Sequence, residues 1–474
     1  MLSVRSGTAR AAVAYTVGAL AVSAALAVSA PAVAARGDTD ADSSATRSIS
    51  GPDSIRPGTY VVVLRGQPAA TYDGHLGGYA ATSPDAGQRF DDRRPQVRHY
   101  RHLLLTAQRR LLARLGDPRE LYSYTAALNG FAVDLDAAQV KALRARTDVI
   151  SVERQSTSRL DTLNPVVRRS ARPARVTRAG RGQVGRSDAG QGVVVGVIDS
   201  GIWPENPSFA GPADAGARAR ALRTGFTGRC ESGEAFTAED CNAKVVAARY
   251  FVRGFGAENI ATADYLSPRD GTGHGSHSAS VAAGNDGVDV RIDGQPMGRV
   301  SGVAPAAHLA VYKACWAAPD PADDGCTTAD TVMAIDQAVR DGVDVINYSV
   351  SGTRTDFADA VELAFLNAAA AGIFVTTSAG NAGPGPATVA HPGPWLTSVG
   401  ATSEDPYEGA VVLGDGRRLA GAMVSDRMVP AGPLVLAGAS PTSATARSCA
   451  RGSGCARVPV RWTPRRSRSS AAGA

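Results

Sequence analysis

From residue 192 to residue 378, apolar runs without a polar face alternate with runs that have helical spacing. The predicted strands are Val193–Ile198, Leu309–Lys313, Val343–Val350 and Ile373–Ser378, and the predicted helices are Thr328–Asp341 and Phe357–Ala371. Strands that are apolar on both sides must be covered on both faces, and intervening helices provide that cover in parallel sheets. The pattern therefore predicts an α/β domain built on a parallel sheet.

A smaller unit is predicted ahead of this domain, between residues 59 and 160. Its expected elements are Thr59–Leu64, His99–Leu115, Leu121–Thr125, Gly130–Leu135, Ala137–Arg146 and Val149–Glu153. The order β-α-β-β-α-β is the ferredoxin-like α+β arrangement. Such a unit either stands alone or serves the larger domain, and the pattern leaves both interpretations open.

The first 35 residues have the composition of a secretory signal. Arg5 and Arg10 precede an apolar stretch, Ala11–Ala30, which small residues follow. A membrane anchor is the alternative for this stretch. We expect a secreted, extracellular product that has a polar linker at residues 36–58 and no membrane association once the signal is removed.

Six cysteines are typical of an oxidising compartment. They form close pairs in the sequence: Cys230 with Cys241, Cys315 with Cys326, and Cys449 with Cys455. Disulfides are favoured over zinc sites, because no pair has the CxxC spacing and no histidine cluster accompanies one. The connectivity stays open at this point.

Two windows, residues 168–186 and 447–468, each carry seven arginines and no acidic residue. They lack the repeated alternation of aromatic and basic residues that is typical of single-strand binders, so we do not expect a nucleic-acid partner. We interpret residues 161–190 as a basic linker. Residues 447–474, which lack core periodicity and capping signals, are interpreted as an aberrant basic tail outside any folded core.

Asp199 follows the predicted strand Val193–Ile198, and His274 lies between glycines at the start of a predicted helix over residues 275–284. A helix start disfavours an imidazolium, which suits a general base. An aspartate that only caps a turn, a surface histidine pair and a metal pair with His277 are the alternatives. The HExxH spacing is missing, so no metal site is predicted.

Asn381 follows the last predicted strand, where its side-chain amide can donate to a developing oxyanion. Asn-Ala-Gly-Pro also fits a simple turn. The chain order aspartate, histidine, amide donor favours one catalytic set over three unrelated structural roles. In parallel sheets such residues meet beyond the carboxyl ends of the strands.

These motifs together resemble the subtilisin-like serine proteases, most closely a secreted branch with an inhibitor-type propeptide and an inserted domain. The strings that carry the resemblance are GVVVGVIDSGIWPENPSF, RDGTGHGSHSAS, TTSAGNAGPGP, GVAPAAHLAVYKACW, DGVDVINYSVSG and YSYTAALNGFAVDLDAAQVKALRARTDVISVE. The resemblance implies a propeptide at residues 59–160, a partial catalytic domain at 191–404 and the start of the inserted domain at 405–446.

By this resemblance Asp199 and His274 are catalytic and Asn381 is the oxyanion donor. Two segments are implied as walls that hold the substrate backbone: Tyr348, Ser349, Val350, Ser351 and Gly352, and Ser378, Ala379 and Gly380. Protein or peptide substrates and the chain's own propeptide are the implied partners. No cofactor is expected; calcium is common among relatives, but the sequence has no Asp-rich ligand loop of the EF-hand kind.

The nucleophilic serine has no convincing candidate in the sequence. No Gly-Thr-Ser-Met-Ala segment follows Asn381, and Ser448 lacks both a small-residue turn and a following helix. We therefore expect a carboxyl-terminally truncated precursor of a serine endopeptidase with an Asp-His-Ser triad, inactive in these 474 residues. The alternative is a secreted, non-enzymatic remnant that binds peptides or inhibits a related protease.

Overall fold

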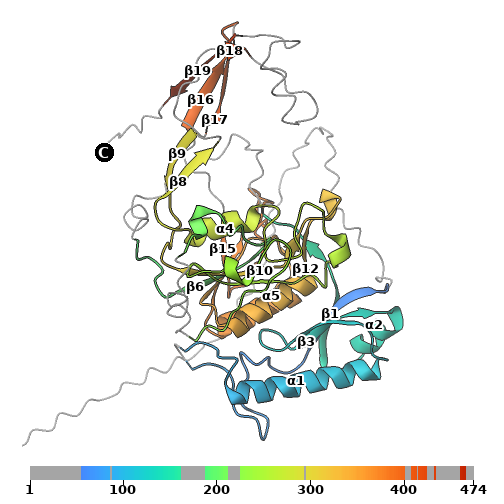
Figure 1. Cartoon of the computed structure of the whole chain (residues 1–474). Helices are drawn as coiled ribbons and strands as arrows, with labels where there is room; N and C mark the ends of the chain where they lie inside the picture. The colour runs from blue at the N-terminus through green and yellow to red at the C-terminus, as the bar shows by residue number, and fades with distance from the viewer. Residues whose placement is uncertain are drawn as a thin grey trace, which may run out of the picture. The chain divides into compact units, whose positions relative to one another are not determined.

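The computed structural model describes residues 55–85, 88–161, 187–211, 225–292, 295–400, 407–413, 415–423, 432–433 and 459–465 (Figure 1). The predicted signal 1–35 and parts of both predicted linkers lie outside these residues, as does the pair Cys449 and Cys455. Among the described residues, no helix is both long enough and apolar enough to cross a membrane.

The amino-terminal unit has the predicted ferredoxin-like order. Its elements are β1 (Gly58–Leu64), α1 (Pro95–Arg114), β2 (Glu120–Tyr124), β3 (Gly130–Leu135), α2 (Ala137–Arg144) and β4 (Val149–Arg154). The strands pair antiparallel in the order β2-β3-β1-β4. A capping box between Asp136 and Gln139 starts α2, and Val140 and Leu143 of α2 join the core that β1 lines.

The larger domain is built on a six-stranded sheet in the order β15-β14-β13-β6-β10-β7, and every neighbouring pair is parallel. Its strands are β6 (Val194–Asp199), β7 (Val245–Tyr250), β10 (His308–Lys313), β13 (Val345–Tyr348), β14 (Phe374–Ser378) and β15 (Thr397–Val399). The α/β prediction is confirmed, whereas β7 and β15 were not expected from the pattern. Ligands of open parallel sheets bind beyond the carboxyl ends of strands such as β6 and β10.

Helices cover both faces of this sheet, which explains its two-sided apolar strands (Figure 1). They are α4 (His274–Ala283), α5 (Thr328–Asp341) and α6 (Ala360–Ala370). Val195 and Val197 of β6 share a core with Ala279 of α4, and Val194 and Ile198 share the opposite core with α5 and α6. The alternation of side chains along β6 therefore places α4 on one face and the other two helices on the other face.

The amino-terminal unit contacts α5 through its edge strand and the loop that follows. The Tyr122 hydroxyl donates to Asp330 Oδ1 at 2.8 Å. The Asp336 carboxylate accepts backbone N–H groups from residues 125, 126 and 127 at 3.0, 2.7 and 2.9 Å. A single buried side chain of α5 thus satisfies three backbone donors of this loop.

Two disulfides join neighbouring parts of the larger domain, Cys230–Cys241 and Cys315–Cys326. The disulfide prediction is confirmed for these two pairs. The second bridge links β11 (Cys315–Trp316) to β12 (Gly325–Thr327), and β12 also pairs antiparallel with β5 (Thr157–Ser158). The Cys315–Cys326 disulfide therefore holds the strand β12, with which residues 157–158 pair after the amino-terminal unit.

The remaining described strands include a segment of the predicted basic tail. A hairpin comprises β8 (Val288–Ile292) and β9 (Gln295–Val300), and a small sheet in the order β17-β16-β19-β18 comprises β16 (Tyr407–Val412), β17 (Arg418–Met423), β18 (Gly432–Pro433) and β19 (Pro459–Arg465). Residues 459–465 of the predicted tail form β19, and the interpretation of residues 447–474 as a tail outside any folded core stays a prediction. Backbone pairing of β19 with β16 needs no apolar periodicity, which is why the pattern missed it.

Candidate active site

Asp199 and His274 lie against each other at the carboxyl edge of the parallel sheet. Asp199 is the last residue of β6 and is fully buried, and His274 is the first residue of α4. The Nδ1 atom of His274 lies 2.7 Å from Asp199 Oδ1, which also accepts the Ser200 N–H at 2.7 Å. The structure thus brings together the two residues that the sequence predicted as a catalytic pair.

The loop before α4 is held by Asp270, a residue that the sequence analysis did not single out. Its Oδ1 accepts from the Ser200 hydroxyl and the Gly273 N–H at 3.0 and 2.8 Å, and its Oδ2 accepts from the backbone and hydroxyl of Ser276 at 2.9 and 2.7 Å. Gly273 has a φ of 86°, which favours glycine. These contacts fix the backbone on both sides of His274.

The pKa of His274 is raised from its ordinary value of 6.5. Burial lowers the pKa, but the hydrogen bond and the negative charge of Asp199 raise it by more. From the sequence, we expect the helix start to disfavour the imidazolium, and the Asp199 carboxylate acts on the pKa in the opposite direction. The carboxylate is in direct contact with the ring, whereas the helix dipole is spread over a whole turn.

The other nitrogen of His274 faces the last described residue of the amino-terminal unit. His274 Nε2 lies 3.3 Å from the Asp161 carbonyl oxygen. Leu160 bridges antiparallel to Val350, the Asp161 N–H donates to the Ser349 carbonyl at 3.1 Å, and the Ser351 N–H donates to the Arg159 carbonyl at 2.8 Å. We call residues 155–161 the tail. Its last residues, 159–161, lie along residues 349–351 as an added strand and end at His274.

The predicted walls divide into residues that face the tail and residues that serve the core. Ser349, Val350 and Ser351 contact the tail through the backbone, as described above. Tyr348 is 2 % exposed and packs against Phe365, so its side chain belongs to the core and does not line the channel. A Cβ on Gly352 would overlap the His391 ring, which explains the glycine there.

The second predicted wall follows β14. The Ser378 hydroxyl contacts the Asp161 carboxylate, whereas the backbone of Ala379 pairs with Val399 and Ala390. Gly380 has a φ of 78° and leads to Asn381, whose side chain is exposed. Asn381 therefore follows a strand that ends at the same edge as β6, as the sequence predicted, and its role as oxyanion donor stays a prediction.

His391 and Glu362 form a second buried histidine–carboxylate pair that sequence reasoning missed. His391 Nδ1 lies 2.6 Å from Glu362 Oε1, and its Nε2 lies 2.9 Å from the Val350 carbonyl oxygen. No short motif marks either residue. The only sequence signal is that a histidine and a glutamate occur within otherwise apolar surroundings, which indicates buried partners for both.

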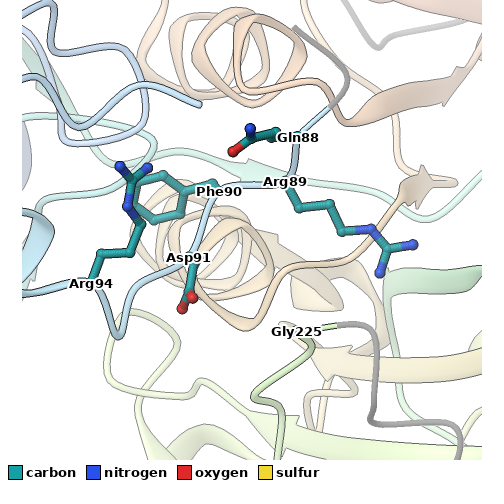
Figure 2. Close-up of a pocket in the computed structure, with 6 residues that line it drawn as sticks. All are labelled: Gln88, Arg89, Phe90, Asp91, Arg94 and Gly225. Carbon is teal, nitrogen blue, oxygen red and sulfur yellow. The ribbon is translucent and has the colours of Figure 1, made fainter. Parts of the chain in front are cut away.

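Two hollows lie beside the amino-terminal unit and its tail. One, of about 510 Å³, is lined by alternate tail residues Gln155, Thr157 and Arg159 and by loop residues around β12. The other, of about 390 Å³, is lined by residues 88–91 with Arg94 and Gly225 (Figure 2). Within the described ranges, no group of three or more histidine, cysteine or acidic side chains has the arrangement of a metal site.

The structure thus combines a parallel sheet that holds an aspartate–histidine pair at its carboxyl edge with an α+β unit whose tail lies against that pair. The chain belongs to the subtilase family. The family model "Subtilase family" matches residues 190–460, more than half of the chain, and the model "Peptidase inhibitor I9" matches residues 59–161.

Curated relatives in Arabidopsis thaliana agree with this assignment. Subtilisin-like protease SBT2.6 is 36% identical over 393 residues, which cover 78% of this chain and 46% of the relative. Subtilisin-like protease SBT2.5 is 37% identical over 383 residues, 76% of this chain and 44% of the relative. The chain thus spans about half the length of these relatives.

A solved structure that is similar is fervidolysin from Fervidobacterium pennivorans, described as a keratinolytic enzyme related to subtilisin. It is 14% identical, and the match covers 70% of this chain and 41% of that chain with a TM-score of 0.36.

Proposed function

We propose that this chain is the precursor of a secreted serine endopeptidase, in which His274 is the general base and Asp199 orients it. The observation that supports the proposal is the position of one carbonyl, Asp161 O, which lies 3.3 Å from His274 Nε2 while Nδ1 is bound to Asp199. This contact places the end of an extended peptide strand beside the outer nitrogen of an oriented histidine, where a serine hydroxyl that attacks the carbonyl carbon could pass its proton to Nε2.

In this proposal the substrate binds as an extended strand along residues 349–351. Two backbone hydrogen bonds on either side of Leu160 define its register, and neither depends on the side chains of the substrate. Asp199 holds the Nδ1–H tautomer, so that the Nε2 lone pair can accept the proton of a serine hydroxyl. Asn381 is proposed to donate its amide to the developing oxyanion.

The tail is proposed to inhibit the site by occupying the substrate position. The tail belongs to a unit that contacts α5 through Tyr122 and the loop after β2. The tail therefore has a high effective concentration at the Asp199–His274 pair. Release of the propeptide would then be required before another peptide can pair with residues 349–351.

The nucleophile is proposed to lie outside these 474 residues, because no Gly-Thr-Ser-Met-Ala segment occurs in them. A polypeptide of this sequence is therefore expected to have no measurable peptidase activity. In subtilisin, loss of the triad serine costs about 2 × 10⁶ in kcat, nearly as much as loss of the whole triad.

A fluorophosphonate probe tests the proposal, because it labels only an activated serine. We compare the 474-residue polypeptide with a product extended by the coding sequence after codon 474, in whichever frame encodes Gly-Thr-Ser-Met-Ala. We expect labelling only of the extended product, lost with His274→Ala and kept with His277→Ala, an exposed histidine of the same helix.

Two results would overturn parts of this proposal. Stoichiometric labelling of the 474-residue polypeptide would show that a serine such as Ser448 serves as nucleophile. Absence of the segment in every frame would favour the non-enzymatic peptide-binding alternative, whereas labelling that survives His274→Ala would show that His274 is not the general base.

A further inference from the structure

The side chain of Asp161 is held by two serine hydroxyls, one from each wall. The Ser351 hydroxyl donates to Asp161 Oδ1 at 2.5 Å, and the Ser378 hydroxyl donates to Asp161 Oδ2. Both carboxylate oxygens therefore have a donor of their own. All three side chains are half-buried, so water is partly excluded from these hydrogen bonds.

The main chain of Asp161 determines which substrate position this side chain represents. Its carbonyl faces His274 Nε2 and its N–H pairs with Ser349. The side chain therefore belongs to the residue that immediately precedes the bond presented to the dyad. A hydroxyl pair that receives it lines the pocket for that residue.

The two hydroxyls differ in what they contact when no carboxylate is present. Ser378 also lies 3.2 Å from the Val350 carbonyl oxygen, to which its hydroxyl can donate instead. For the Ser351 hydroxyl, the acceptor found among the described residues is Asp161. An apolar side chain in the pocket would leave Ser351 without that acceptor, which carries a cost that an acidic side chain avoids.

We propose that Ser351 and Ser378 form a specificity pocket that selects substrates with aspartate before the scissile bond. This inference rests on the proposed peptidase function and names its substrate class. Asparagine is the second choice, because its amide oxygen accepts one hydroxyl and its amide nitrogen can donate to the other. Leucine, which has a similar shape but no acceptor, is disfavoured.

The pocket recognises the Asp161 carboxylate through hydrogen bonds and not through an opposite charge. Both donors that hold the Asp161 carboxylate are neutral hydroxyls. Selection therefore depends on hydrogen-bond geometry, which fixes the length of the side chain. Glutamate is longer by one methylene and would have to displace its carboxylate from both hydroxyls, so it is expected to bind less well.

Hydrogen exchange at the Ser351 amide tests the pocket without any need for activity. This N–H donates to the Arg159 carbonyl, so its exchange rate reports how often the tail leaves the wall. In the full chain we expect Asp161→Leu and Ser351→Ala each to raise the exchange rate by roughly tenfold, and Asp161→Asn by less than about threefold. The double variant Asp161→Leu with Ser351→Ala should exchange no faster than Asp161→Leu alone.

Ser349→Ala is the matched control, because the Ser349 hydroxyl lies in the same wall but contacts Asn347. Its effect should add fully to that of Asp161→Leu. The pocket is overturned if Ser351→Ala is also additive with Asp161→Leu, or if Asp161→Leu leaves the exchange rate unchanged. Both outcomes can be read from the 474-residue chain.

A second experiment distinguishes a failure of the proposed pocket from a failure of the proposed peptidase function. In it, the extended product hydrolyses a set of peptides that differ in the residue before the cleaved bond. We expect kcat/KM for aspartate before the cleaved bond to exceed that for leucine by at least roughly tenfold, and Ser351→Ala to reduce this ratio. Cleavage that prefers leucine would overturn the pocket. No cleavage of any peptide, together with a coupled exchange result, would refute the peptidase function and leave the pocket as a binding site.

Discussion

Two buried histidines in this chain have nearly the same contacts. In His274 and in His391, Nδ1 lies 2.7 and 2.6 Å from a carboxylate, of Asp199 and Glu362 respectively, and Nε2 lies 3.3 and 2.9 Å from a backbone carbonyl. The pKa of each is raised, because the carboxylate outweighs the effect of burial. Local chemistry alone does not distinguish the two pairs.

The pairs differ in where the second carbonyl comes from. For His391 it is Val350, part of the wall itself, and the ring is 2 % exposed. For His274 it is Asp161, the end of a tail that belongs to a different unit. A histidine–carboxylate pair therefore stabilises the structure where the carbonyl that faces Nε2 belongs to the same domain, as for His391. The pair can serve a reaction where another peptide can replace that carbonyl, as for His274.

The largest expected difference between the pairs concerns stability. Glu362→Ala should lower the free energy of unfolding by about 3–5 kcal/mol, because it removes one partner of a buried histidine–carboxylate pair. Asp199→Ala should cost about 1–3 kcal/mol, since His274 is 9 % exposed against 2 % for His391, so water can replace part of the lost contact. Urea unfolding at neutral pH measures both. Equal losses would contradict the distinction.

A smaller effect is expected where the wall contacts the ring of His391. Gly352→Ala introduces a Cβ that overlaps this ring, at an expected cost of about 1–3 kcal/mol. Gly77→Ala, at a loop glycine with open space around its Cα, is the control and should stay within about 0.5 kcal/mol of the wild type. A Gly352→Ala variant as stable as this control would show that the wall does not depend on the position of His391.

The smallest expected effect is the pH dependence of the His391 contribution. The pKa of His391 in the folded protein lies above its ordinary value of 6.5, so the stabilisation is full below about pH 6.5 and is lost as the pH rises through the raised pKa. The stability difference between wild type and His391→Gln should therefore shrink from about pH 6 to about pH 9. A difference that grows over this range would contradict a charged His391.

Much of the fold was predictable from sequence because its signals are local. Gly130–Leu135 and Thr328–Asp341 were predicted with the observed bounds, since strand alternation and helical spacing operate within one segment. Strand β15 has three residues and no buried side chain, so its place depends on pairing with β14. β19 likewise depends on a partner that is distant in the sequence.

The candidate site divides in the same way. His274 was predicted because glycines around a histidine at a helix start are a recognisable local pattern. Asp270 and Glu362 act through contacts with residues that are distant in the sequence or in another element. Asp270 lies inside the quoted histidine motif, but the string does not show its contact with Ser200, and no motif surrounds Glu362. The Asp161 contacts could not be predicted either, because they join segments separated by 190 and 217 positions.

The most direct test of the account is a titration of both histidine side chains by NMR in the wild type and in Asp199→Asn. Removal of the carboxylate leaves burial as the main influence on the His274 ring, so we expect its pKa to fall below the ordinary value of 6.5. His391 keeps Glu362 and serves as the internal reference, with an unchanged pKa. A pKa of His274 that stays raised in Asp199→Asn would show that Asp199 does not hold this histidine, and would contradict the proposed catalytic pair.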